Sequence, residues 1–203
     1  MIAIVDYGMG NVGSVRNALR YLGAESEITA EPDQLLAATH VILPGVGSFV
    51  DGMRNLQERG LVPLLQEIAR GGKTPLLGIC LGMQLFADTG EEGGSSAGLG
   101  MIKGVTRRFQ VASTYRIPHV GWNDVIPSPK ARLFAGIKKP VYYFVHGYHV
   151  VPVDGSVIVG TTKYGETFAS SIEQGLVFGV QFHPEKSQHA GLTLLENFLK
   201  IKS

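Results

Sequence analysis

Residues 74–84 read Thr-Pro-Leu-Leu-Gly-Ile-Cys-Leu-Gly-Met-Gln, an apolar strand pattern that passes directly into a helical one. Gly78 and Gly82 each lie two residues from Cys80, which is the spacing of a nucleophile elbow, a sharp strand-to-helix turn that requires small neighbours. Such a turn directs the side chain outward, and the unpaired N–H groups at the helix N-terminus favour the thiolate over the thiol. A lone cysteine is more often a buried core residue, but two glycines at a strand end favour a nucleophile.

The same order of strand and helix precedes this stretch twice. An apolar run at 2–6 leads to a helical pattern that begins after Asn11, an expected N-cap, and a run at 40–43 leads to a pattern that ends at Ile68. A third helical pattern, at 81–87, follows Cys80. This alternation predicts a three-layer α/β architecture, with a mostly parallel sheet flanked by helices on both faces.

The second half of the chain has a different pattern. A Gly- and Ser-rich stretch at 90–100 predicts an exposed loop, and a stripe of leucines near the C-terminus predicts a closing helix. Between them we expect an antiparallel region. Its predicted strands span 101–109, 119–126, 141–150, 157–163, 166–172 and 176–182. Because the chain has no repeat and no long linker, we expect residues 1–203 to form a single domain.

Composition excludes several classes of function. A formal net charge of +1 and a pI near 7.9 give no excess of Lys and Arg for nucleic acid or for an acidic membrane surface. One cysteine cannot form an internal disulfide, and the N-terminus lacks a signal-peptide pattern, so we expect a cytoplasmic protein. No uncharged apolar run approaches the ~18 residues that a membrane span requires.

A histidine and a glutamate lie two residues apart near the C-terminus, in the run His183-Pro184-Glu185. If the preceding strand continues, both side chains lie on one face with Cα atoms roughly 6.6 Å apart, so that the carboxylate can orient the imidazole. Pro184 favours an extended backbone at His183. By itself this tripeptide is more often a surface turn, but together with the elbow it predicts a general base for Cys80.

The other histidines do not indicate a metal site. His146 and His149 lie three residues apart, which in one strand places them on opposite faces, and a single cysteine leaves no zinc cluster for them to join. His40 and His119 begin apolar strands, where we expect structural or exposed positions, and His189 begins the last helix. We therefore expect no metal and no cofactor.

A second strand-end loop, Pro-Gly-Val-Gly-Ser at 44–48, follows the apolar run at 40–43. Its glycines permit backbone dihedrals closed to other residues, so the loop can bring amides to the same sheet edge as Cys80. An oxyanion formed in acyl transfer requires donors from two directions, which this loop and the elbow can supply. Gln84 lies four residues after Cys80, on the same helical face, and we expect it to meet a polar amino acid substrate.

These stretches resemble the class I glutamine amidotransferases, which combine a nucleophile elbow with a late His-x-Glu pair. The resemblance extends to 5–11, 44–49, 118–123, 143–146 and 182–187, and so covers nearly the whole chain in order. It implies glutamine hydrolysis, and Gly147 stands where the family carries a hydroxyl residue, so only main-chain contact is expected there. The implied roles are a triad of Cys80, His183 and Glu185, an oxyanion hole of Leu81, Val46 and Gly47, and glutamine contacts from Gln84, Gly47, Gly147 and Tyr148.

The implied reaction releases ammonia, which loses its nucleophilic lone pair when it is protonated in water, so a second catalytic centre must receive it directly. The chain has no phosphate-binding G-x-x-x-x-G-K-[ST] loop and no unassigned segment for that centre. The resemblance therefore implies a heterodimer with a (β/α)8 cyclase, which makes imidazole glycerol phosphate and an aminoimidazole carboxamide ribotide in histidine biosynthesis. Lys186, Tyr143 and Asn11 are the expected interface residues.

Three alternatives stay open from the sequence. The chain can serve another ammonia-channelling synthase, such as the one that makes pyridoxal phosphate. A cysteine hydrolase of γ-glutamyl peptides uses the same triad. A non-catalytic regulatory protein can bind glutamine on the same fold.

Overall fold

The computed structural model describes residues 1–202, and its main element is a sheet of eight strands. The first five strands in sheet order pair in parallel, and the remaining three pair antiparallel. The predicted parallel sheet with an antiparallel second half is therefore confirmed. In sheet order the strands are β2 (Ser26–Thr29), β1 (Ile2–Val5), β3 (His40–Gly45), β4 (Leu76–Cys80), β14 (Val177–Val180), β13 (Glu166–Gln174), β12 (Ile158–Tyr164) and β9 (Ile126–Pro127).

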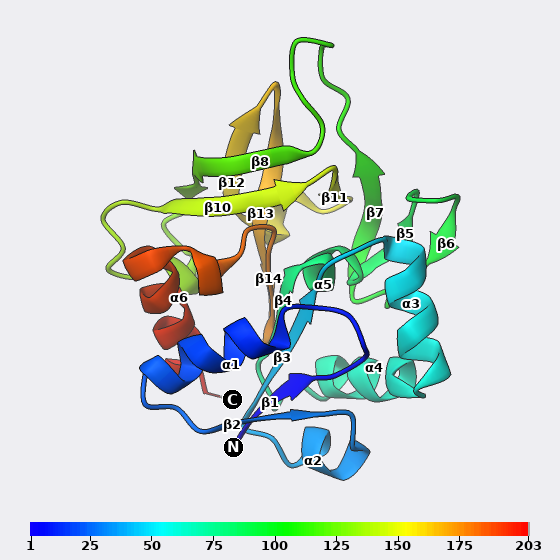
Figure 1. The fold of residues 1–203 in the computed structure, drawn as a ribbon, viewed down its shortest axis with the longest axis vertical. Helices are drawn as coiled ribbons and strands as arrows, with labels where there is room; N and C mark the ends of the chain where they lie inside the picture. Colours follow the sequence, from blue (N-terminus) through cyan, green and yellow to red (C-terminus); the bar gives the residue numbers. More distant parts are fainter. Residues whose placement is uncertain (203) are drawn as a thin grey trace.

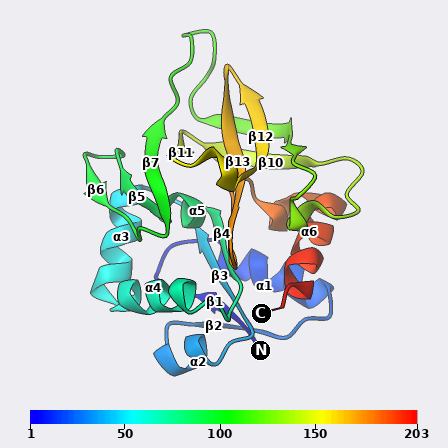
Figure 2. The same cartoon turned by 180° about the vertical axis from the view of Figure 1, so that it is seen from behind.

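Helices cover both faces of this sheet: α2 (Pro32–Leu36), α3 (Phe49–Glu58) and α4 (Leu61–Gly71) on one, and α1 (Val12–Tyr21) and α6 (Gln188–Lys200) on the other. Figure 1 shows α1 and α6 together on one side and α3 and α4 on the other, and Figure 2 shows the same separation from behind. Alternate residues of β1 face the two cores. Ala3 and Val5 share a core with α2, α3 and α4, whereas Ile2 and Ile4 share one with α1 and α6.

The remaining strands form separate, smaller sheets. Two further sheets contain β10 (Val141–His146) with β8 (His119–Asp124), and β11 (Tyr148–Pro152), β7 (Ile102–Arg108), β5 (Ala87–Gly90) and β6 (Ser96–Ala97). The short elements are helix α5 (Leu81–Gln84) and the 3-10 turns η1 (Arg132–Phe134), η2 (Gly155–Val157) and η3 (Pro184–Lys186).

Three predicted elements differ from the structure. The strand expected at 141–150 is two strands, because Gly147 separates β10 and β11, which belong to different sheets. The helix expected at 81–87 is only α5, because the chain enters β5 at Ala87 and pairs with β7. The loop expected at 90–100 contains the short strand β6, which pairs with β5.

Strand β4 is central to the arrangement of the site. It pairs in parallel with β3 on one side, where Gly45 lies opposite Cys80, and with β14 on the other, where Val180 lies opposite Ile79. Parallel pairing brings the carboxyl ends of all three strands to one edge of the sheet, where ligands of open α/β sheets bind. The loop at 44–48, the elbow and the segment after β14 therefore meet at that edge.

Candidate active site

Cys80 adopts a strained backbone conformation at the junction of β4 and α5. Its φ of 55° and ψ of −109° lie in a backbone region that residues other than glycine rarely adopt. Such a conformation typically costs about 1–3 kcal/mol. A Cβ atom at Gly82 would collide with the carbonyl oxygen of Leu43, and one at Gly78 would approach the backbone of Gly82 to less than 3.0 Å. Both glycines are required by close backbone approach, as the elbow spacing predicts.

Cys80 is only 6% exposed, yet it lines a cavity of about 240 Å³. Its thiol faces the carbonyl oxygen of Val145 at 3.9 Å, and it accepts a hydrogen bond from the Nε2 of Gln181 at 3.6 Å. The sulfur is therefore part of the core on one side and open to a ligand-sized space on the other.

The structure brings His183 and Glu185 together, with 2.9 Å between imidazole Nδ1 and carboxylate Oε1. The expected strand geometry is wrong here, since β14 ends at Val180 and Glu185 lies in η3. The turn η3 brings Glu185 to His183 instead. Because a carboxylate accepts, Nδ1 carries a proton, which leaves Nε2 free; this atom has no hydrogen-bond partner among residues 1–202.

The electrostatic surroundings of His183 favour its protonated form. Burial lowers the pKa of this histidine, but the adjacent Cys80 sulfur and the Glu185 carboxylate outweigh burial and raise the pKa to about 9. The side chains of His183 and Glu185 are 2% and 1% exposed, so water screens their interaction only weakly. The site thus favours an imidazolium at His183, next to the Cys80 sulfur.

The cavity next to Cys80 is lined by all of the residues predicted to bind substrate and to form the oxyanion hole. Gly47 contributes backbone with a φ of +105°, a conformation that favours glycine. Glu92 also lines the cavity, although the sequence placed it in an exposed loop; its carboxylate accepts a hydrogen bond from the Phe49 N–H at 2.8 Å. The predicted residues in the wall are Val46, Gly47, Leu81, Gln84, Gly147 and Tyr148, and the unpredicted ones are Glu92, Val145 and His146.

Gln84 is held by hydrogen bonds within the protein. Its Nε2 donates to the Tyr148 carbonyl oxygen at 2.8 Å and to the Gln181 Oε1 at 3.1 Å. Both amide hydrogens are therefore used, whereas its side-chain oxygen has no protein partner among residues 1–202. A substrate contact from Gln84 is expected at that oxygen, which can accept from an amino group.

Three histidines outside the triad, His119, His146 and His149, form a buried cluster, and the expectation of opposite faces for His146 and His149 is wrong. Because Gly147 divides the two strands, both rings pack on Phe109, with centroids 5.1 and 4.9 Å from it. His119 is also buried, which is the structural position of the two expected for it, and its Nδ1 lies 3.2 Å from the Nε2 of His146. Burial lowers the pKa of His119 to about 4 and that of His146 to about 3, so both rings are neutral near pH 7.

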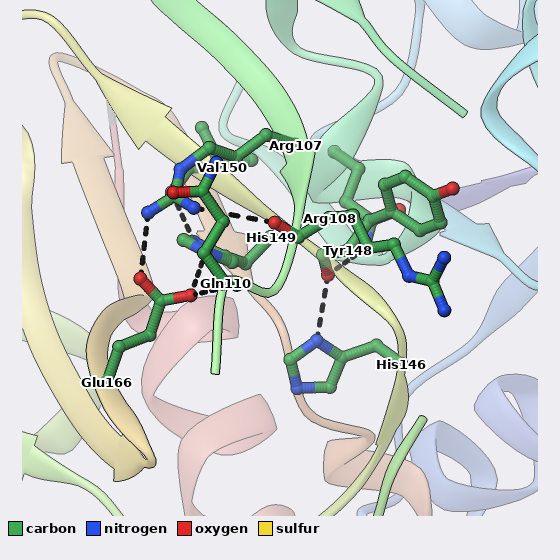
Figure 3. A network of polar contacts seen from close by, with 9 residues as sticks. Arg107, Arg108, Gln110, His146, Tyr148, His149, Val150 and Glu166 are labelled. Atoms are coloured by element: carbon green, nitrogen blue, oxygen red, sulfur yellow. Dashed lines mark hydrogen bonds and ion pairs between the residues drawn. The ribbon is translucent and has the colours of Figure 1, made fainter. Parts of the chain in front are cut away.

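No group of three or more His, Cys, Asp or Glu side chains within residues 1–202 is arranged to hold a metal ion. Figure 3 shows what the cluster does instead. The His146 ring is directed at the Tyr148 carbonyl, and Arg107 and His149 are directed at Glu166.

Two of the expected interface residues lie together beside the triad. The Nζ of Lys186 lies 6.0 Å from the centroid of the Tyr143 ring, and the Tyr143 carbonyl accepts the His183 N–H at 2.9 Å. Trp122, which is 49% exposed, packs edge-on against Tyr143 and was not predicted. Asn11 occupies the N-cap position of α1 without a side-chain capping bond, so its amide is not used for that purpose.

A larger cavity, of about 670 Å³, lies between Trp122, the segment at 136–139 and the start of α6. None of the predicted triad lines it. We place the candidate active site in the smaller cavity, because that one contains the strained cysteine.

Comparison with known proteins agrees with the geometry. The family described as glutamine amidotransferase class-I matches residues 3–201. The HisH subunit of imidazole glycerol phosphate synthase from Moorella thermoacetica is 53% identical over 97% of this chain and 93% of that protein, and HisH 2 from Methanococcus maripaludis is 48% identical over 98% and 99%.

Solved structures agree at the level of the fold. A glutamine amidotransferase crystal structure superimposes with a TM-score of 0.78 at 19% identity, covering 98% of both chains. The structure of PurLQS from Thermotoga maritima gives a TM-score of 0.73 at 22% identity over 98% of this chain and 96% of that one. On the full-length match and the identities above, the chain belongs to the class I glutamine amidotransferase family and, within it, to the HisH family.

Proposed function

We propose that this protein hydrolyses L-glutamine to glutamate and ammonia and delivers the ammonia to a separate cyclase subunit. One observation carries the proposal: a strained cysteine, with a histidine-glutamate pair beside it, opens into a cavity of about 240 Å³. This volume suits a small amino acid. The identity of 53% and 48% to two HisH subunits of imidazole glycerol phosphate synthase supports histidine biosynthesis as the setting.

In the proposed mechanism His183 accepts the thiol proton as the Cys80 sulfur attacks the side-chain amide carbon of glutamine. The carbon–nitrogen bond then breaks as His183 passes that proton to the departing ammonia. Water, activated by the then neutral imidazole, hydrolyses the thioester to glutamate and restores the thiol. Glu185 orients the imidazole and stabilises its charge. The backbone N–H groups of Leu81 and of the Val46–Gly47 loop hold the oxyanion, a role in which one donor is typically worth ~10²–10³ in rate.

Delivery of ammonia requires a partner. The proposed partner is a (β/α)8 cyclase that makes imidazole glycerol phosphate and an aminoimidazole carboxamide ribotide. The pair formed by Lys186 and Tyr143, together with Asn11, is the proposed contact surface. Its support is location, since the backbone of Tyr143 is hydrogen-bonded to that of His183.

We further propose that residues 1–203 act as one glutamine amidotransferase domain in the cytoplasm. The eight-stranded sheet supports a single domain, because strands from both halves of the chain pair within it. A reducing compartment suits a catalytic thiol that must stay reduced. No helix within residues 1–202 has the length and apolar character needed to cross a membrane.

The direct test is glutamate release by wild type and Cys80→Ala, each assayed with the cyclase subunit and its nucleotide substrate. We expect the substitution to abolish turnover, because no other cysteine exists in the chain. Equal turnover in the two proteins would end the assignment.

The same preparation separates the alternatives. Activation of glutamine hydrolysis by a pyridoxal phosphate synthase, and not by the cyclase, would identify that synthase as the partner. Faster hydrolysis of γ-glutamyl peptides than of glutamine would indicate a peptide hydrolase. Failure of a glutamine-like electrophile to label Cys80 would indicate a non-catalytic glutamine-binding protein.

A further inference from the structure

Gln181 is fully buried beside the nucleophile, at the point where the chain leaves β14. We propose that its side-chain amide donates a hydrogen bond to the Cys80 sulfur and so holds the nucleophile in its ionised, outward-facing form. The inference deepens the proposed glutaminase function and rests on it. The donor-acceptor distance is 3.6 Å, within the range of a hydrogen bond to sulfur.

The direction of this bond follows from a main-chain carbonyl. The Tyr148 oxygen can only accept, so the Gln84 atom at 2.8 Å must be the amide nitrogen. The second hydrogen of that nitrogen points to Gln181 at 3.1 Å, so the Gln181 atom facing it must be the amide oxygen. The nitrogen of Gln181 is then left to face Cys80, and it can only donate.

A second series of hydrogen bonds also ends at the Tyr148 carbonyl oxygen. The Nδ1 of His146 lies 2.8 Å from the Tyr148 oxygen, a contact drawn in Figure 3, and it must donate because a carbonyl oxygen only accepts. In the neutral ring the Nε2 is then an acceptor, which receives the Nδ1–H of His119 at 3.2 Å. The Nε2 of His119 in turn faces the amide of Asn123 at 3.3 Å. The positions of all protons in this series are thus determined with both His146 and His119 neutral.

The anchoring of Gln181 makes the contact to sulfur rigid. Its backbone N–H donates to the Ser170 carbonyl at 3.0 Å, and its side chain is clamped between Gln84 and Cys80. The sulfur itself lies between a donor, Gln181, and an acceptor, the Val145 carbonyl at 3.9 Å. Loss of the thiol proton removes the bond to Val145 and strengthens the one from Gln181, because a charged acceptor binds a donor more strongly.

The test compares Cys80 alkylation by iodoacetamide and glutamine hydrolysis in wild type, Gln181→Met and Gln181→Glu, all in complex with the cyclase. Methionine keeps the volume but removes both the donor to Cys80 and the oxygen that accepts from Gln84. Glutamate still accepts from Gln84 but turns an oxygen toward the sulfur. We expect Gln181→Met to alkylate roughly tenfold more slowly at pH 7, with a similar fall in kcat and little change in KM. Gln181→Glu should fall further.

Raising the pH distinguishes a hydrogen bond from general loosening of the site. If Gln181 favours the thiolate, alkylation of Gln181→Met should approach the wild-type rate in alkaline buffer, whereas a disordered elbow stays slow at every pH. Gln66→Met is the matched control, since the Gln66 amide also donates to a carbonyl, that of Leu99 at 2.9 Å, away from the site. It should leave both rates unchanged.

Wild-type alkylation rates in Gln181→Met at pH 7, or a deficit that persists in alkaline buffer, would overturn the inference. If that variant does not fold, Gln181→Glu takes its place, and wild-type alkylation of it has the same consequence. A wild-type complex that alkylates normally but releases no glutamate would refute the proposed function alone, because alkylation reports the hydrogen bond independently of glutamine.

Discussion

Gly82→Ala is the substitution with the most clearly defined structural consequence. The added carbon would meet the backbone carbonyl of Leu43 in β3, where neither a rotamer change nor a flexible side chain can relieve the contact. The elbow and β3 would have to separate by more than about 1 Å. Overpacking of this kind costs roughly 1–3 kcal/mol of stability. A displacement of about 1 Å at a reacting group costs on the order of 10²-fold in rate.

We therefore expect Gly82→Ala to fold with a lowered unfolding midpoint and to lose about 100-fold in kcat/KM for glutamine. The assay is glutamate release in the presence of the cyclase and its nucleotide substrate, with denaturant unfolding run in parallel. Gly71→Ala is the control, because a Cβ atom at this last residue of α4 meets nothing within 4 Å. It should keep full activity. A Gly82→Ala protein with wild-type kcat/KM and stability would refute the steric reasoning.

Two further predictions concern the triad and the partner. Glu185→Gln removes a group that raises the pKa of His183 to about 9, so the alkaline limb of the kcat/KM profile, expected near pH 9 in wild type, should move to lower pH. The sign follows because the imidazolium needed to protonate ammonia persists until the pH exceeds that raised pKa. We expect the variant to keep roughly 10⁻²–10⁻⁴ of the wild-type activity. An alkaline limb at the same pH as in wild type would contradict the predicted shift. Lys186→Ala and Tyr143→Ala should each weaken cyclase binding by about fivefold or more in isothermal titration, and unchanged affinity in both would exclude this surface.

The elbow could be predicted from sequence because its determinants are local. Glycines two residues to either side of Cys80 are visible in the chain, and the structure explains each by a close backbone approach. The His183–Glu185 pairing was also predicted, although for the wrong local reason. A carboxylate two residues away reaches the imidazole from the turn η3 as well as it would from a strand.

The missed features depend on contacts between distant segments. Gln181 looks like an ordinary inward residue at a strand end, and only folding brings it to Gln84, 97 positions earlier in the chain. The histidine cluster was misjudged because alternation along a strand fails where Gly147 interrupts it. Strand β2 was not predicted either, since Ser-Glu-Ile-Thr at 26–29 is a partly exposed edge strand without a continuous apolar run.

The position of β4 between β3 and β14 has a consequence for how the enzyme loses activity. The two strands that end near the thiol and the imidazole are adjacent and buried along their whole length, so neither can fray from the rest of the molecule. Loss of activity in urea should consequently coincide with cooperative unfolding, and no inactive but folded intermediate should precede it.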